Sequence, residues 1–106
     1  MSVGEDLDNE KQVTAIVDIF VDTTRLEDVI RDLCKINSVE EAYEVTGEFD
    51  IATMVISKSI EEFRDTLKNK IMKIPGVKSV VSSIVLKVAK GPRAEHISLE
   101  NSNSGN

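Results

Sequence analysis

The chain has 106 residues, of which 41% are hydrophobic and 30% are charged, and this length suits one domain with a single core. Its formal net charge of -6, with no segregated basic patch, argues against nucleic-acid binding, because the phosphate backbone repels an acidic protein. No apolar run approaches the roughly 18 residues of a membrane span, and the acidic N-terminus does not resemble a signal peptide. We therefore expect a cytoplasmic protein that binds neither nucleic acid nor membrane.

Both ends of the chain differ from its centre. Residues 1–12 and 91–106 are polar and lack hydrophobic periodicity, which is typical of disordered segments. The sequence therefore predicts one folded domain over residues 13–90.

The first half of this domain is predicted to form a strand followed by a helix. Apolar and β-branched residues alternate with period two from Val13 to Phe20, which indicates a strand. Thr24 and Glu27 have the spacing of a capping box at the start of a helix. The apolar positions that follow recur at helical spacing and place Cys34 on the buried side of this helix.

The second half repeats the strand and helix pattern. A hairpin is predicted from strands at 39–46 and 51–57, with Gly47 at the reversal. Ser59 and Glu62 form a second capping box, and the helix after it ends at Pro75-Gly76. A long fourth strand is predicted over 77–89.

An internal repeat determines the predicted topology. Leu33-Cys-Lys-Ile-Asn-Ser-Val39 and Ile71-Met-Lys-Ile-Pro-Gly-Val77 share one pattern of apolar and turn residues, so each half is a strand-helix-strand unit. Two such units predict a ferredoxin-like βαββαβ fold, an α+β class with a four-stranded antiparallel sheet and both helices on one face. The last strand carries apolar residues on both of its faces, because Val77, Val81 and Val85 lie opposite in parity to Val80, Ile84, Leu86 and Val88. The uncovered face is therefore predicted to bury against a second copy as a dimeric α+β barrel.

The sequence offers little catalytic chemistry. His96, the only histidine, falls in the predicted tail, and no phosphate-loop, dinucleotide or metal-binding motif is present, so no cofactor and no metal are expected. Asp50, at the predicted hairpin, suits one of two roles. Its carboxylate lies over turn amides and takes a ligand's ammonium group, or it only ties its own turn together through an Asx-type bond.

Four segments resemble the ligand-binding RAM domain of Lrp/AsnC-type transcription regulators. They are Val13-Thr-Ala-Ile-Val17, the run from Val39 to Asp50 that ends in Gly-Glu-Phe-Asp, Lys73-Ile-Pro-Gly-Val77, and Ser83-Ile-Val-Leu-Lys-Val88. The resemblance implies a non-enzymatic domain that dimerises, assembles into tetramers or octamers, and binds a free amino acid between dimers. Only twelve residues precede Val13, so the chain resembles stand-alone members without a helix-turn-helix, and full-length regulators of the family are implied partners.

The resemblance also implies the residues of the binding site. Those on the hairpin are Glu44, Thr46, Gly47, Phe49 and Asp50, those on the last strand are Ser82 and Ser83, and those on the second helix are Asn69 and Met72. The family often has Thr-x-Thr on the last strand, whereas this chain has Val80-Val81-Ser82-Ser83, which changes the hydroxyl pattern there.

Two other interpretations remain open at this point. An ACT-like module that regulates an amino-acid metabolic enzyme shares the fold, but it usually has a glycine where this chain has Asp22-Thr23-Thr24. A small enzyme with a dimeric α+β barrel would need a polar pair inside the barrel, and the arginines are predicted on helix surfaces or in the tail.

Overall fold

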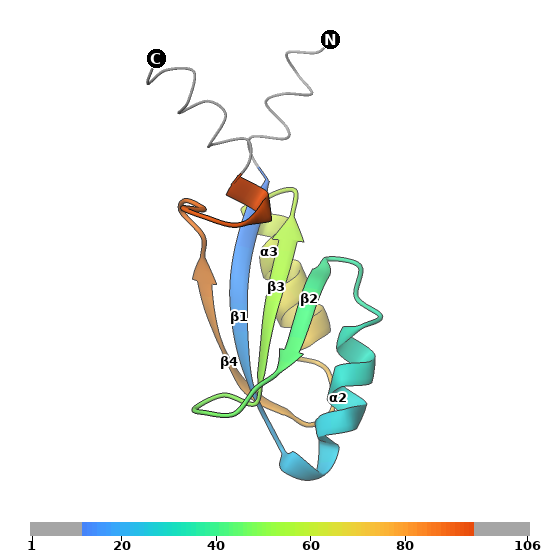
Figure 1. The fold of residues 1–106 in the computed structure, drawn as a ribbon. Helices are drawn as coiled ribbons and strands as arrows, with labels where there is room; N and C mark the ends of the chain where they lie inside the picture. The colour runs from blue at the N-terminus through green and yellow to red at the C-terminus, as the bar shows by residue number, and fades with distance from the viewer. Residues whose placement is uncertain (1–11, 95–106) are drawn as a thin grey trace, which may run out of the picture.

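A computed structural model describes residues 12–94 (Figure 1). Its elements, in chain order, are β1 (Val13–Val21), η1 (Thr23–Arg25), α2 (Leu26–Leu33), β2 (Val39–Glu44), β3 (Ile51–Ser57), α3 (Ile60–Thr66), η2 (Leu67–Ile71), β4 (Val77–Ile84) and η3 (Pro92–Ala94). Here η1 and η3 are 3₁₀ helices, and η2 is a π-helical turn that continues α3.

The four strands form one antiparallel sheet in the order β2-β3-β1-β4. The two central strands, β1 and β3, are each the first strand of one repeat, and each helix connects two strands that are not hydrogen-bonded neighbours. This order and the two helices confirm the predicted ferredoxin-like βαββαβ fold.

The core lies between the helices and one face of the sheet. Alternate residues of β1 and β3 point into it, from Ala15 to Val21 and from Ile51 to Ser57. Val29 and Leu33 of α2, and Phe63 of α3, pack against the same residues. Both helices therefore cover the same face, as Figure 1 shows for α3 behind the sheet.

The start of the first helix differs from the predicted capping box. The carboxylate of Asp22 accepts hydrogen bonds from the backbone N–H and the hydroxyl of Thr24, at 3.1 and 2.9 Å. Thr24 thus donates to the cap residue and does not itself cap α2, whose N-terminus has no side-chain cap. The same bonds lower the pKa of Asp22, because the side-chain bond and then the backbone bond from Thr24 favour the ionised carboxylate.

The predicted burial of Cys34 is wrong. Helix α2 ends at Leu33, and Cys34 is the exposed residue that follows it. The helical periodicity used to place Cys34 does not extend past the last helical residue, so its side chain leaves the buried stripe.

The predicted cap at Ser59 is confirmed, but the Glu62 carboxylate bonds one residue further back than a capping box requires. The Ser59 hydroxyl accepts a hydrogen bond from the backbone N–H of Glu62 at 3.0 Å, and the Glu62 carboxylate accepts one from the N–H of Lys58 at 2.6 Å.

The internal repeat also has a structural counterpart, because Leu33 and Ile71 are both fully buried ends of helical segments. Counting from the observed caps, the offset is 59-22 = 37 residues at the start and 71-33 = 38 at the end. A π-helical turn such as η2 accommodates one extra residue of this kind.

The last strand is shorter than predicted. Strand β4 ends at Ile84 rather than Ala89, because beyond the bond from the Val85 N–H to the Thr14 carbonyl, at 2.8 Å, no strand pairing continues within the described residues. The chain then passes through η3, where Ala94 is buried and Arg93 lies 3.5 Å from Glu40. Described structure thus extends four residues past the predicted domain end at residue 90, and the remaining predicted disordered residues, with His96, lie outside the described part of the chain.

The sheet face opposite the helices is uncovered, and we call it the open face. Its members, identified from the strand pairing, are Thr14, Ile16, Asp18, Phe20, Glu41, Tyr43, Ala52, Met54, Ile56, Ser79, Val81 and Ser83. Ile16, Tyr43 and Val81 are exposed to 45%, 55% and 49%. The prediction of apolar residues on both faces of the last strand is confirmed at Val81, but Val77 is on the helix side, because a register shift next to Val21 reverses the alternation.

Candidate functional site

The turn between β2 and β3 brings five of the predicted binding residues together. Residues 45–50 close the hairpin through a hydrogen bond from the Val45 N–H to the Asp50 carbonyl, at 3.1 Å. Gly47 has a φ of +142°, which an L side chain rarely adopts, and no atom lies within 4 Å of where its Cβ would be. The tip of the turn is therefore open to solvent, and a ligand has room to approach its backbone.

Asp50 fastens this turn to the central strand β1. Its carboxylate oxygen Oδ2 accepts a hydrogen bond from the backbone N–H of Val21 at 2.8 Å, and its own N–H donates to the Ile19 carbonyl at 3.0 Å. The carboxylate is thus committed to another strand, and neither of the two roles predicted for it describes this contact. Asp50 holds the hairpin in place relative to the open face.

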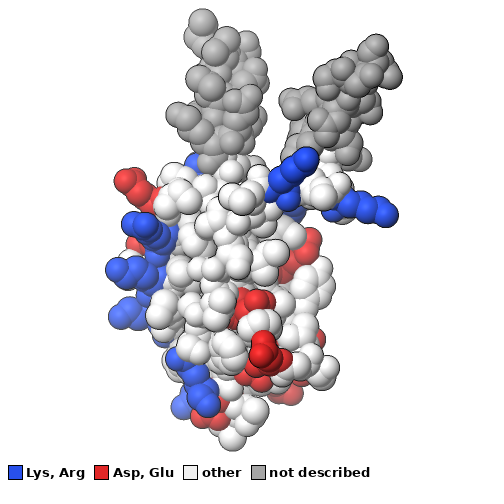
Figure 2. Space-filling view, turned by 90° about the vertical axis from the view of Figure 1, so that its left-hand side faces the viewer, with Lys and Arg blue, Asp and Glu red and all other residues white. Residues whose placement is uncertain are grey.

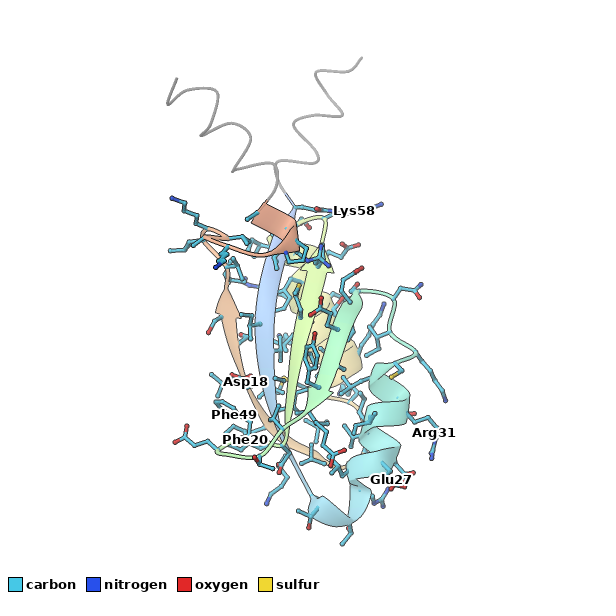
Figure 3. All side chains as sticks on the ribbon, in the orientation of Figure 1. Asp18, Phe20, Glu27, Arg31, Phe49 and Lys58 are labelled. Carbon is cyan, nitrogen blue, oxygen red and sulfur yellow. The ribbon has the colours of Figure 1, made fainter. Side chains whose placement is uncertain are left out.

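An aromatic pair provides a second attachment. The rings of Phe49, in the turn, and Phe20, on the open face of β1, have centroids 5.3 Å apart and an angle of 71° between planes. This edge-to-face arrangement is a favoured aromatic geometry. Figure 3 shows both rings at the hairpin end of the sheet, below Asp18.

The other predicted residues lie on different surfaces of the protomer. Ser83 pairs with Ile16 and is on the open face, whereas Ser82 pairs with the buried Val17 and faces the helix side. Asn69 and Met72 are exposed on η2 and just after it, and the Asn69 amide donates to Asp65 at 2.6 Å. One protomer therefore brings the hairpin residues together, with Ser83 on the same face, but does not bring them to Ser82, Asn69 and Met72.

Sequence analysis missed two residues of this region, Asp18 and Phe20. Both lie on the open face of β1, where Asp18 sits between Ala52 of β3 and Val81 of β4. The signal was present in the alternation of β1, because Asp18 is the only ionisable residue among Thr14, Ile16, Asp18 and Phe20. Asp18 becomes part of this region only because the hairpin folds toward β1, and the sequence pattern does not show that arrangement.

Charge is distributed unevenly over the surface. In Figure 2 Lys and Arg side chains follow the edge occupied by the helix layer, while Asp and Glu side chains gather toward the hairpin end. The helix side includes the exposed residues Lys68, Lys70 and Lys73, and the hairpin includes Glu44 and Glu48. A cationic group is therefore attracted to the hairpin side.

Residues 12–94 hold no group of three or more His, Cys, Asp or Glu side chains arranged to bind a metal ion. An open depression at the start of α2 is lined by Thr23, Thr24, Leu26, Glu27 and Asp28, none of which is a predicted binding residue. Across that same stretch, the helices are too short or too polar to cross a membrane.

Residues 14–94 match the protein family of the Lrp/AsnC ligand binding domain. The chain belongs to the Lrp/AsnC family. Among curated relatives, an HTH-type transcriptional regulator of Pyrococcus furiosus is 32% identical over 79 residues, covering 74% of this chain and 53% of the relative. The regulator Ptr1 of Methanocaldococcus jannaschii is 28% identical over the same coverage of both chains. This Lrp/AsnC domain thus spans about half the length of the curated relatives it matches.

Solved structures show the same fold for this Lrp/AsnC domain. AsnC of Escherichia coli superposes with a TM-score of 0.74 at 26% identity, covering 82% of this chain and 58% of AsnC. A protein of Thermus thermophilus superposes with a TM-score of 0.70 at 25% identity, covering 74% of this chain and 99% of its own. A feast or famine regulatory protein of Mycobacterium tuberculosis, solved with L-methionine, gives 0.69 at 26% identity, with coverages of 85% and 59%.

Proposed function

We propose that this domain senses a free amino acid, which it binds in a cleft between protomers, and that it is not an enzyme. The observation that carries the proposal is the hairpin, which is fixed to β1 by the Asp50 to Val21 bond and ends in an open glycine turn. Two further facts support it: the match to a ligand-binding domain, and the relative solved with L-methionine. The family match also favours this function over an ACT-like module.

The proposed site requires more than one protomer. Its residues are Glu44, Thr46, Gly47, Phe49, Asp50, Asn69, Met72, Ser82 and Ser83. The hairpin group and the group on η2 lie on different layers of one chain, so a cleft lined by both needs a neighbouring copy. Backbone N–H groups of the turn would bind the α-carboxylate, and Met72, which is 48% exposed, would contact the ligand's side chain.

A second copy is the occupant that we propose for the open face. Three large apolar side chains there, Ile16, Tyr43 and Val81, are about half exposed, and this is the surface that a two-fold pairing of sheets would bury. Dimers would then associate into tetramers or octamers through the hairpin clefts. Val81→Lys is expected to dissociate the dimer in light scattering, whereas the helix-side variant Lys70→Ala leaves it intact.

We propose that the domain acts by forming mixed assemblies with full-length regulators of the family. Residues 14–94 correspond to the domain that those regulators carry, so a shared assembly surface is expected. The match that covers 99% of the T. thermophilus chain supports a family member of about this size. Because the curated relatives are transcription regulators, we also propose a cytoplasmic location. Co-purification with a tagged regulator of the family tests the idea, and self-association alone would contradict it.

A thermal-shift screen against the twenty amino acids tests the proposed ligand. A ligand that binds only the native state stabilises it by about 2.7 kcal/mol when present at 100 times its Kd. We expect a selective shift, smaller in Met72→Ala than in the control Lys70→Ala on the same helical turn. If no amino acid shifts the unfolding temperature of a folded oligomer, the proposed ligand class is wrong.

A further inference from the structure

Asp18 is a half-buried carboxylate in an apolar part of the open face. Its strand neighbours are Ala52 and Val81, and Ile16 precedes it on the same face. Within residues 12–94 it makes no side-chain hydrogen bond and no ion pair. A carboxylate in this position is free to receive a donor from outside the protomer.

The surroundings of Asp18 are suited to an ammonium group. Phe20, two residues further along the same face, forms the ring pair with Phe49, so the hairpin turn and Asp18 meet at one corner of the sheet (Figure 3). Aromatic rings attract cations, and a carboxylate accepts a charge-assisted bond from them. Ser79 and Ser83, on the same face of β4, carry hydroxyls that can donate to a carboxylate. The corner therefore matches both charged groups of a free amino acid.

Asp50 is less suited to this task. One of its carboxylate oxygens already accepts the Val21 N–H, and this bond fixes the hairpin. We propose that Asp18 binds the ammonium group of the amino acid, and that Asp50 acts as a positioning residue for the hairpin. This inference rests on the proposed amino-acid-sensing function and names the residue that recognises the ammonium group.

Burial strengthens the argument. If a second copy covers the open face, Asp18 loses water, and an ionised carboxylate without a partner is costly to bury. The open-face positions of the four strands include no Lys or Arg, and Arg93 of η3 lies beside Glu40. A cation supplied by the ligand would neutralise Asp18 without requiring any basic side chain on this face.

Binding of the twenty amino acids to wild type and to Asp18→Asn, followed by thermal shift and calorimetry, tests the inference. Asn keeps the shape of the side chain and removes its charge. The control is Asp28→Asn, which removes an exposed carboxylate that pairs with Arg31 at 2.9 Å on the outer side of α2. We expect Asp18→Asn to weaken binding about tenfold or more, the scale of one lost charge-assisted bond, with no effect in the control. The N-acetyl derivative of the bound amino acid, which lacks the ammonium, should bind both proteins equally weakly.

Three other outcomes would each overturn the assignment of Asp18 as the ammonium-binding residue, and they can be told apart. If wild type binds an amino acid and Asp18→Asn binds it equally well, Asp18 is not the ammonium site, and the sensing function stands. If Asp18→Asn dissociates the ligand-free dimer in light scattering, Asp18 contributes to the contact with the second copy instead of binding the ammonium group. If wild type binds none of the twenty, the sensing function and this inference both fail.

Discussion

The carboxylate of Asp50 and the backbone N–H of Val21, 29 residues apart in the chain, form a 2.8 Å hydrogen bond that joins the hairpin turn to the central strand. Val21 is buried, and it lies where the register between β1 and β4 shifts, so the carboxylate takes the place of a strand acceptor at this position. The hairpin is thus held by a side chain as well as by its own backbone.

Loss of this carboxylate is expected to destabilise the fold. Asp50→Ala leaves the Val21 N–H without an acceptor, which costs about 1–3 kcal/mol of unfolding free energy. Glu48→Ala, in the same turn but exposed, should change it by less than about 0.5 kcal/mol. Urea denaturation followed by circular dichroism, at one protein concentration, measures both. Equal losses in the two variants would mean that the bond contributes nothing specific.

A second test concerns the two turn glycines. Gly76 has a φ of +102°, and a Cβ there would lie 2.6 Å from the Arg25 Cβ and 3.0 Å from the Val29 Cγ2. Gly76→Ala therefore combines backbone strain with overpacking and is expected to cost about 2–4 kcal/mol. Gly47→Ala introduces backbone strain without a steric clash, because no atom lies within 4 Å of its Cβ position, and it should cost about 1–2 kcal/mol. Thermal or urea unfolding compares them, and an equal cost would contradict the clash.

The fold was predictable because its signals are local. The apolar run from Ile51 to Ser57 defined β3 to the residue, and the Ser59 capping box placed the start of α3. Errors arose where the local pattern is interrupted. The register shift beside Val21 puts Val77 on the helix side, and counting residues cannot detect such a shift.

The candidate site was less predictable, because it depends on contacts between distant segments. The Gly-Glu-Phe-Asp pattern identified the hairpin, but the partner of Asp50 is a backbone group of another strand. Asp18 and Phe20 become part of the region only when Phe49 packs on Phe20. The surfaces that carry Asn69 and Met72 can join the hairpin only across protomers, and one chain's sequence does not encode that geometry in a local pattern.

Tyr43, the only tyrosine in a chain without tryptophan, allows a direct spectroscopic test of the open face. Its hydroxyl donates to the Glu41 carboxylate at 2.8 Å, and this bond, followed by the nearby negative charge, raises the pKa of Tyr43 above its ordinary value. The stabilisation belongs to the protonated phenol. It is fully present below the pKa of the unfolded chain and is lost as the pH rises through the higher pKa of the folded protein.

The tyrosinate absorbance should therefore show a midpoint above about 10 in wild type and a return toward about 10 in Glu41→Ala. Glu44→Ala, which removes an exposed carboxylate from the same strand, serves as the control and should keep the raised midpoint. An unchanged midpoint in Glu41→Ala would show that the bond to Glu41 does not set the pKa of Tyr43.

The neighbours Leu33 and Cys34 test where α2 ends. Leu33 is fully buried, so Leu33→Ala is expected to cost about 2–5 kcal/mol of stability. Cys34 is the exposed residue after the helix, so Cys34→Ser should change stability by less than about 0.5 kcal/mol. The Cys34 thiol should also react with a maleimide in the native protein at a rate close to that of the urea-unfolded chain, because accessibility does not limit it. Strong protection of the native thiol, with a large loss of stability in Cys34→Ser, would instead place Cys34 on the buried stripe.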